Sequence, residues 1–294
     1  ETPANEHLIA GDKQNAAHEL SEKEEIEKTV SEEDSSEQSL KADIVPLWER
    51  ADSEKNMPKA LKGEKKDYRI AAGFDDYRTK KERFADNINA IELLRKLEQE
   101  ERYADTAEQD VLSKYAGWGG IPEVYDEENE SWHDEYIRLK ELLTDEEYLS
   151  ARESTLTAFY TPKTVIDGIY KALENMGFKQ GNILEPSCGV GNFIGCLPDS
   201  MRESRVYGIE LDKISGSIAK QLYQNASIAV DGYENTNLPD SFFDVAIGNV
   251  PFGDFKVSDP KYNKYNWLIH DYFFGKTLDK VRPGGIIAFV TAKG

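Results

Sequence analysis

The stretch that decides the fold is Glu185-Pro186-Ser187-Cys188-Gly189-Val190-Gly191-Asn192-Phe193, which follows a short apolar run at residues 183–184. Two glycines in a tight turn between a strand and a helix let the backbone approach a ligand at the carboxyl end of the strand. The turn lacks the third glycine of a dinucleotide-binding fingerprint and the Lys-Ser/Thr pair of a P-loop. It therefore predicts a ligand-binding turn of another kind in an α/β fold.

Strands and helices are predicted to alternate around this turn. Apolar runs of strand length occur at residues 183–184, 206–209, 228–230, 243–247 and 286–290, and helical stretches at 214–223 and 268–281 separate several of them. This alternation indicates right-handed crossovers and a mainly parallel sheet with helices on both faces. Because the chain stops directly after the last predicted strand, we expect the sheet to be truncated at its C-terminal end.

Polar residues beside the predicted strands are candidates for ligand contacts. Glu210 ends the strand that follows the turn, about one strand–helix–strand unit after Glu185. Taken alone, a carboxylate at a strand end is more often simply solvated. Together with the glycine turn, an acid in this place is expected to accept hydrogen bonds from both hydroxyls of a ribose. Upstream, Thr161 and Pro162 predict the start of a helix, with Thr161 as the N-cap and Pro162 as the first helical residue.

Charge and composition divide the chain into three regions. The net charge of -20 lies almost wholly before residue 151, because residues 151–294 hold 16 acidic and 15 basic side chains. Residues 1–65 are poor in aromatics and rich in Glu and Ser, so we expect a disordered acidic segment or linker. We expect a small helical region at residues 66–154 and the α/β domain at residues 155–294.

The helical region carries its own signals. Apolar residues at helical spacing predict one buried face, made of Phe84, Ile88, Ile91 and Leu94. Thr106 with Gln109, and Thr144 with Glu147, fit the capping-box pattern at helix starts. Trp118 lies in a glycine-rich turn, where packing between helices is a more common role than ligand contact.

The cysteines and histidines exclude several kinds of site. Two cysteines and four scattered histidines offer no metal-ligand spacing, and the chain has no secretory signal or long apolar run. We therefore expect no metal site, no membrane association and a cytoplasmic location. Nothing in the sequence suggests a lowered pKa for the thiol of Cys188, so we expect it to pack in the turn.

The order of the motifs resembles that of the gamma-type amino methyltransferases. Thr161-Pro162, the 185–193 turn, Glu210 and then Asn249-Val250-Pro251-Phe252 follow one another across residues 155–294. Residues 66–294 also resemble a segment of the very large methylase–helicase proteins of bacterial mobile elements and phages. The resemblance implies a Rossmann-like class I methyltransferase fold, S-adenosylmethionine as cofactor, a bacterial or phage protein, and a larger polypeptide with helicase and target-recognition regions.

The resemblance also implies which residues meet the cofactor. Tyr160, Thr161 and Pro162 would flank its methionine moiety. The turn would lie beneath, through Glu185, Pro186, Ser187, Cys188, Gly189, Gly191, Asn192 and Phe193. Glu210 would hold the ribose. Asp231, after the third strand, is the acid that we expect at the cofactor adenine, with Glu234 and Asn235 as rivals.

The second motif suits chemistry at an exocyclic amine on a nucleobase. Acceptors against the two N–H groups pull such an amine toward a tetrahedral geometry and stabilise the charge that builds during attack. The Asn249 side-chain oxygen is one acceptor, and the Val250 carbonyl, held by Pro251, is the other. Phe252 offers a face on which an extruded base stacks. The family usually has proline where this chain has Val250, which restores an N–H and leaves open a weaker activity.

Adenine N6 in DNA is the amine that the motif order and the resemblance favour. Downstream, cations alternate with aromatics, as in a surface that binds phosphates and stacks bases, or else the segment is an ordinary loop. The residues of this expected DNA surface are Lys256, Lys261, Tyr262, Lys264 and Tyr265. Two other classes stay open: a catalytically weak cofactor- or DNA-binding module of a mobile-element protein, and an amino methyltransferase that acts on RNA or protein.

Overall fold

The computed structural model describes residues 61–71, 78–155 and 161–291. Residues 1–60, which make up most of the expected acidic segment, lie outside the described residues. Tyr160 also lies outside them. The first described residues join the folded core, since the Lys62 N–H donates to the Glu101 carbonyl (2.9 Å) and the Lys62 carbonyl accepts from the Tyr103 N–H (3.0 Å).

Helices dominate the part before residue 160. They are α3 (Lys80–Glu100), α4 (Thr106–Leu112), α5 (His133–Leu142) and α6 (Asp145–Ser154), with short 3-10 turns η1 (Pro122–Tyr125) and η2 (Glu130–Trp132). The later part contains the helices α7 (Lys163–Asn175), α8 (Asn192–Gly195), α9 (Lys213–Leu222) and α10 (Ile269–Lys280), with 3-10 turns η3 (Asp199–Met201), η4 (Tyr233–Asn235) and η5 (Asn263–Tyr265).

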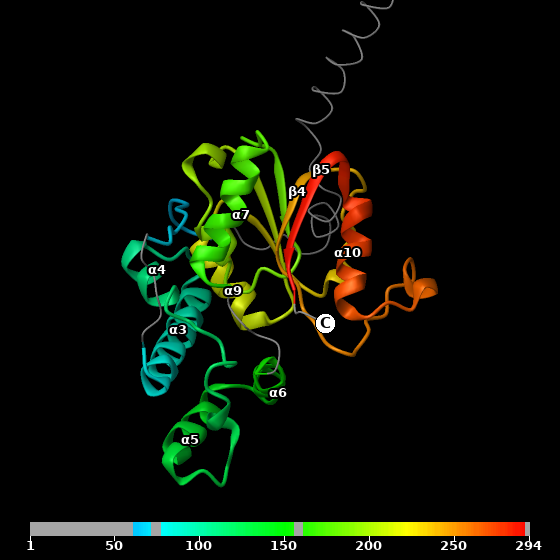
Figure 1. Cartoon of the computed structure of the whole chain (residues 1–294). Coiled ribbons are helices and arrows are strands. Elements are labelled where there is room, and N and C mark those ends of the chain that lie inside the picture. Colours follow the sequence, from blue (N-terminus) through cyan, green and yellow to red (C-terminus); the bar gives the residue numbers. More distant parts are fainter. Residues whose placement is uncertain (1–60, 72–77, 156–160, 292–294) are drawn as a thin grey trace, which may run out of the picture. The chain divides into compact units, whose positions relative to one another are not determined.

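Among the described residues, five strands form one parallel sheet (Figure 1). They are β1 (Asn182–Glu185), β2 (Arg205–Glu210), β3 (Ser227–Val230), β4 (Phe243–Asn249) and β5 (Val281–Val290), in the order β3-β2-β1-β4-β5. Every neighbouring pair is parallel. The strand order reverses between β1 and β4, which is where α/β sheets of this kind open a crevice for ligands. The prediction of a Rossmann-like α/β fold is confirmed.

Helices cover both faces of the sheet. Ile183 and Val245 pack with Leu173 of α7, in a cluster that also takes in Val290 of β5. Successive side chains on a strand point to opposite faces, so Phe289 points away from α7. The Phe289 ring contacts Phe274 of α10 (centroids 5.1 Å apart), so α10 covers the other face (Figure 1).

Two helix starts differ by one residue from those predicted. In α7 the N-cap is Pro162, so Thr161 precedes the cap, and its buried hydroxyl has no hydrogen-bond partner among the described residues. The prediction that Thr161 caps this helix and that Pro162 is its first residue was wrong. In α4 the capping box joins Asp105 and Glu108 rather than Thr106 and Gln109.

The other capping prediction holds, because Thr144 and Glu147 form the expected box at the start of α6. Asp at the cap of α4 is physically reasonable, since its carboxylate accepts the Glu108 N–H (2.9 Å) and complements the positive end of the helix. One residue of displacement is enough to change which side chain caps a helix, because only the residue with extended backbone at the boundary can reach the free N–H groups.

The early helices share one hydrophobic core with α9. Phe84 and Ile91 of α3 belong to the same buried cluster as Ile218 and Leu222 of α9. Trp118 is fully buried in this core, where its ring contacts those of Phe84, Tyr115 and Tyr125, so the packing role expected for it is confirmed.

Buried glutamines connect the same two parts at the end of α9. The Gln109 amide donates to the carbonyls of Gln221 (3.0 Å) and Leu222 (3.1 Å). The Gln221 side chain accepts the Ala104 N–H (2.8 Å), and the Gln224 amide donates to the Ala104 carbonyl (2.9 Å). These bonds satisfy carbonyls that the last turn of a helix otherwise leaves open.

Candidate active site

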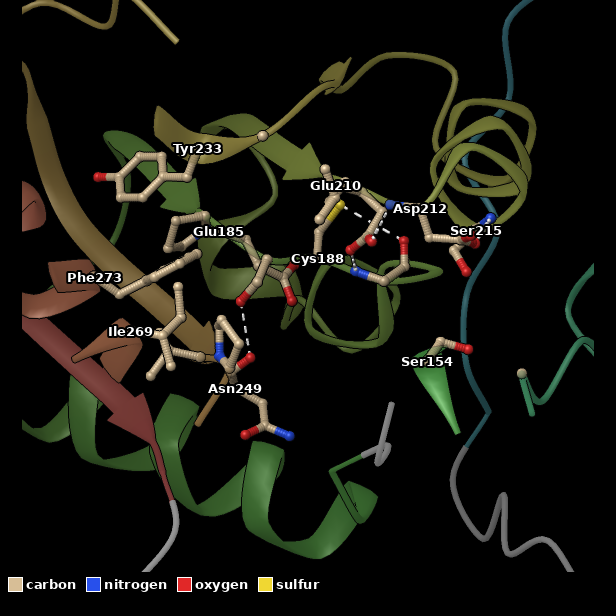
Figure 2. A pocket seen from close by; sticks show the side chains of 18 of the residues that line it. Ser154, Glu185, Cys188, Glu210, Asp212, Ser215, Tyr233, Asn249, Ile269 and Phe273 are labelled. Atoms are coloured by element: carbon tan, nitrogen blue, oxygen red, sulfur yellow. Dashed lines mark hydrogen bonds between the residues drawn. The ribbon is translucent and has the colours of Figure 1, made fainter. Parts of the chain in front are cut away.

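A cavity of about 530 Å³ lies at the carboxyl ends of the strands (Figure 2). This volume is in the range that holds a small organic ligand or a nucleoside-sized cofactor. Most of the residues predicted for the site line it: Thr161, Glu185, Pro186, Ser187, Cys188, Gly189, Asn192, Phe193, Glu210, Asp231, Asn249, Val250, Pro251 and Phe252. The structure therefore brings the glycine turn, the two acids and the end of β4 around one space.

The glycine turn needs glycine at both positions, and Gly191 is required for two reasons. Gly189 (φ 55°) and Gly191 (φ 83°) both have left-handed backbone, which glycine adopts at little cost. A Cβ at Gly191 would lie 2.3 Å from the Tyr223 ring, so the turn also fits closely against α9. Gly191 and Pro162 are not among the cavity-lining residues; Gly191 shapes the turn, and Pro162 begins α7.

Glu210 fastens the glycine turn to the end of β2. One carboxylate oxygen accepts the Gly189 N–H and the other accepts the Asp212 N–H, both at 2.7 Å. Each oxygen keeps a second lone pair for a ligand. Burial disfavours the charged form and raises the pKa of Glu210 to about 7, against the two backbone hydrogen bonds that favour the carboxylate.

Glu185 is a buried acid that lines the cavity. Its side chain is 2% exposed, and Oε2 has no hydrogen-bond partner among the described residues. Burial, and then the nearby Glu210, raise the pKa of Glu185 well above its ordinary value. Figure 2 shows Glu185, Glu210 and Asn249 around the same pocket. A buried polar atom in this condition is satisfied by a ligand that brings a donor or a positive charge.

Two hydrogen bonds hold the end of β4 in place. The Ser187 hydroxyl donates to the Asn249 backbone carbonyl (2.8 Å), which joins the glycine turn directly to the second motif. The Val250 N–H donates to the Val290 carbonyl (3.1 Å) and so extends the pairing of β4 with β5. The N–H that valine restores at this position is therefore used by the sheet.

Comparison of sequences finds relatives in phages and viruses. The chain is 27% identical over 209 residues to "Defense against restriction protein B" of Escherichia phage P1, across 69% of this chain and 8% of the relative. It is 37% identical over 94 residues to "Type II methyltransferase M.CvrRI" of Paramecium bursaria Chlorella virus XZ-6E (32% and 24%). It is 25% identical over 148 residues to "Modification methylase CviBIII" of Paramecium bursaria Chlorella virus NC1A (47% and 38%). The chain is homologous to viral modification methylases.

The similarity to these two viral methylases confirms the expected relationship to methyltransferases. The chain spans less than half of the length of each of these relatives. No protein-family model matches it. Among solved structures, a Listeria monocytogenes protein described as a class I S-adenosylmethionine-dependent methyltransferase shares 17% identity over 71% of this chain and 72% of that one, with a TM-score of 0.40.

One wall of the cavity was missed by the sequence analysis. The lining residues of this wall belong to the helical region and are Tyr115, Gly117, Ser150, Glu153 and Ser154. Buried Asn87 holds this wall, since its amide donates to the Gly117 carbonyl (2.7 Å) and its oxygen accepts the Ala116 N–H (2.8 Å). No local motif marks these residues, because tertiary packing alone brings them to the strand ends.

The opposite wall is formed by residues after β3, after β4 and on α10, of which the sequence analysis named only Glu234, as a rival for the cofactor adenine. They are Gly232, Tyr233 and Glu234 after β3, Phe255 and Val257 after β4, and Ile269 and Phe273 of α10. Five of the seven are apolar or aromatic. This side of the cavity is therefore suited to a flat, partly apolar group, whereas the glycine-turn side is rich in carboxylates.

The structure changes the expected DNA surface. Tyr262 is buried (6% exposed) and its hydroxyl donates to Asp279 (2.8 Å), so the prediction that Tyr262 belongs to this surface was wrong. Lys261 is half-exposed and forms ion pairs with Asp240 and Asp279. Tyr265 is half-exposed, with the Lys264 ammonium 4.8 Å above its ring.

The following findings on metal sites and membrane-spanning helices apply to the described residues alone. In those residues no group of three or more His, Cys, Asp or Glu side chains could hold a metal ion. No helix in the same ranges has both the length and the apolar character needed to cross a membrane. Burial, followed by the nearby acids, raises the pKa of the Cys188 thiol well above its ordinary value, in keeping with a packing role for this cysteine.

Proposed function

We propose that this chain binds S-adenosylmethionine and transfers a methyl group to the exocyclic N6 amine of adenine in DNA. One observation carries the proposal: the cavity between the glycine turn and residues 249–252 is a single space, and the 2.8 Å bond from Ser187 to Asn249 keeps its two sides together. An acid-rich side that fits a cationic ligand and an apolar side that fits a base then lie within reach of one another.

The residues on the glycine-turn side fit the cofactor. The unsatisfied Oε2 of Glu185 suits the α-ammonium of the methionine moiety, and the unpartnered hydroxyl of Thr161 suits its carboxylate. The free lone pairs of Glu210 suit the ribose hydroxyls. When bound, the cofactor supplies an electrophilic methyl group on a sulfonium.

Asp231 remains our choice for the cofactor adenine. One of its oxygens, Oδ1, accepts the Gly232 N–H (2.7 Å) and the Asn235 amide (2.8 Å). These bonds orient the carboxylate on the cavity wall, and Asn235 serves as its support. The second oxygen of Asp231 can accept from the exocyclic amine of the adenine ring.

The residues at the end of β4 act on the target amine. The Asn249 side-chain oxygen and the Val250 carbonyl accept from its two N–H groups and stabilise the positive charge that develops during attack. Phe252 provides the stacking face for a base taken out of the helix. No residue has to remove the proton before attack, so the main contribution of the site is the position of the amine.

The proposal is tested by transfer of tritium from labelled S-adenosylmethionine to DNA. Alternating dA–dT and dG–dC duplexes are compared as acceptors, with RNA and protein acceptors in parallel. We expect incorporation only into the adenine-containing DNA. Asn249→Ala should lower the rate by about 10²-fold or more, while S-adenosylhomocysteine binds it as tightly as the unchanged chain in calorimetry. Equal incorporation by Asn249→Ala would remove the role assigned to this side chain.

Val250 favours one second candidate, a catalytically weak cofactor- or DNA-binding module. Its N–H is bound to Val290, so the carbonyl orientation depends on the sheet rather than on a proline ring. This candidate predicts binding of S-adenosylhomocysteine without methyl transfer to any of the acceptors.

Under either candidate, DNA would contact the exposed Lys264 and Tyr265, with Lys256 and Lys261 beside them. The chain would act as part of a larger polypeptide with helicase and target-recognition regions.

A further inference from the structure

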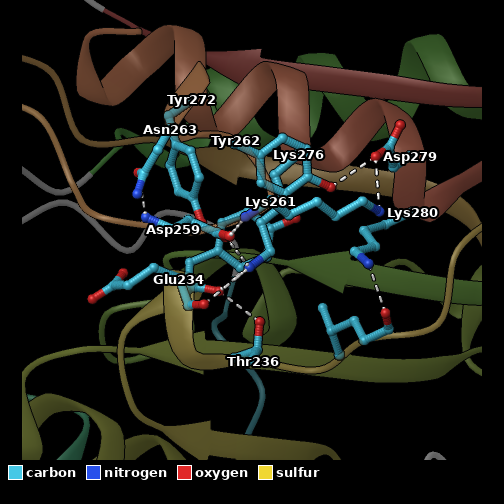
Figure 3. Close-up of polar contacts among 12 residues, drawn as sticks. Glu234, Thr236, Asp259, Lys261, Tyr262, Asn263, Tyr272, Lys276, Asp279 and Lys280 are labelled. Atoms are coloured by element: carbon cyan, nitrogen blue, oxygen red, sulfur yellow. Dashed lines mark hydrogen bonds and ion pairs between the residues drawn. The ribbon is translucent and has the colours of Figure 1, made fainter. Parts of the chain in front are cut away.

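A buried lysine lies between the two loops that line the cavity opposite the glycine turn. Lys276 of α10 has a side chain that is only 3% exposed, and its ammonium has three partners (Figure 3). It donates to the Tyr233 carbonyl (2.6 Å), to the Asp259 carboxylate (3.0 Å) and to the Glu234 carbonyl (3.4 Å). All three of its protons are thus used.

The partners of Lys276 belong to segments with different places at the cavity. Tyr233 and Glu234 follow β3, in the segment proposed to meet the cofactor adenine. Asp259 lies in the segment 250–268, which follows β4 and lines the cavity through Phe252, Phe255 and Val257. Lys276 is therefore bound at once to the cofactor side and to the target side.

Asp259 in turn organises the segment 250–268. Its second oxygen, Oδ1, accepts the Lys261 N–H (3.0 Å), and its backbone carbonyl accepts the N–H groups of Tyr262 (2.9 Å) and Asn263 (2.8 Å). The Tyr272 hydroxyl donates to the same oxygen that binds Lys276 (2.7 Å). A change at the Lys276 ammonium therefore reaches the backbone turn of this segment through one carboxylate.

The buried charges depend closely on each other. Burial alone would raise the pKa of Asp259, but hydrogen bonds from Tyr272 and Lys276 outweigh it and leave that pKa below its ordinary value. Burial lowers the pKa of Lys276, and Asp259 offsets part of this effect. A buried charge that loses its partner is strongly destabilised, so removal of either side chain is expected to displace the other.

We propose that Lys276 is a positioning residue that couples the two sides of the cavity, so that binding of the cofactor at residues 231–234 orders the target segment 250–268. The inference rests on the proposed cofactor site. Contact with a ligand fixes the carbonyls of Tyr233 and Glu234, these fix the ammonium, and the ammonium holds Asp259. By linkage, the target segment in its ordered form favours cofactor binding to the same extent.

Lys280 provides a matched control on the same helix, one turn later. It is also buried, and it donates to the Leu238 carbonyl (2.7 Å) and to Asp240 (2.6 Å). Leu238 and Asp240 are not among the residues that line the cavity. Lys280→Met removes a buried, ion-paired lysine as Lys276→Met does, and it leaves the three bonds of Lys276 in place. Its contact with the target segment is indirect, because its partner Asp240 also forms an ion pair with the half-exposed Lys261.

Hydrogen exchange of the whole chain tests the coupling, with S-adenosylhomocysteine as the added ligand. The target segment is followed at the amides of Tyr262, Asn263, Tyr265 and Asn266, which are bonded within it. The glycine turn is followed at Gly189. In the unchanged chain and in Lys280→Met we expect the ligand to slow exchange at both places, at the target segment by about fivefold or more.

Lys276→Met should keep the protection at Gly189 and lose the ligand response at the target segment. Asp259→Asn leaves the sequence of α10 unaltered and removes the negative charge that pairs with Lys276, so it should lose the same response and serves if Lys276→Met does not fold. A target response that persists in either variant overturns the coupling. A missing response at Gly189 in the unchanged chain overturns the proposed cofactor site, and the coupling with it.

Discussion

Replacement of Glu210 by glutamine tests the electrostatics of the cavity directly. The pKa of Glu210 in the folded chain is about 7, against an ordinary value of 4.5. The folded chain therefore keeps a proton that the unfolded chain releases earlier. Stability from this group is complete below pH 4.5 and is lost as the pH rises through 7, up to a total of roughly 3 kcal/mol. The cavity is open to solvent, so this figure is an upper bound.

The variant should be compared with the unchanged chain at pH 5.5 and pH 8.5. The unchanged chain loses about 2 kcal/mol of the Glu210 contribution across this range, and Glu210→Gln loses none of it. Glutamine keeps one acceptor oxygen for the N–H groups of Gly189 and Asp212, so the variant also loses about 1 kcal/mol at both pH values for the weakened hydrogen bond. The difference in unfolding free energy should thus shift by roughly 2 kcal/mol in favour of the variant at the higher pH.

Urea unfolding followed by circular dichroism measures this difference. Glu203→Gln removes an exposed carboxylate and controls for the lost charge, with an expected change below about 0.5 kcal/mol at either pH. The affinity for S-adenosylhomocysteine should rise with pH through 7 in the unchanged chain, because the ionised Glu210 is the better acceptor for ribose hydroxyls. Glu210→Gln should bind about tenfold more weakly or worse, the cost of one hydrogen bond to a charged group. A stability difference that does not change with pH would refute this reasoning.

Three further substitutions test the backbone and the walls of the cavity. Gly191→Ala should lower the unfolding free energy by about 3 kcal/mol or more, because of its φ of 83° and the contact with Tyr223. Gly168→Ala, by contrast, should be neutral or stabilising by up to about 1 kcal/mol, because nothing is found within 4 Å of the new Cβ. Thermal unfolding compares the two variants. Val250→Pro should cost about 1 kcal/mol through the lost bond to Val290, and a urea midpoint equal to that of the unchanged chain would contradict the role given to this N–H. Asn87→Ala should cost about 2–4 kcal/mol, since it leaves the buried Gly117 carbonyl and the partly buried Ala116 N–H without this partner. It should also weaken S-adenosylhomocysteine binding in calorimetry, and unchanged affinity would show that this wall does not contact the ligand.

The sheet and the cavity could be predicted because their signals are local. Each apolar run of strand length became a strand, and the glycine turn and Asn249 stand at strand ends, which parallel pairing brings to one edge. The burial of Tyr262 could not be predicted, since it depends on Asp279, 17 positions away on α10. The wall held by Asn87 has the same origin, because residues 30 positions apart meet only after α3 has packed. The capping errors at Thr161 and Thr106 arose from a shift of one residue, which residue preferences do not resolve.

The glutamine bonds between the early helices and the end of α9 have a consequence for how this protein can be divided. A fragment that starts at residue 155 would keep every strand, yet it would leave Ile218 and Leu222 facing water and the last carbonyls of α9 without the Gln109 amide. Such a fragment should aggregate rather than fold. Recombination that exchanges the α/β domain among related genes would therefore have to exchange the helical region as well. The two parts are expected to be inherited together.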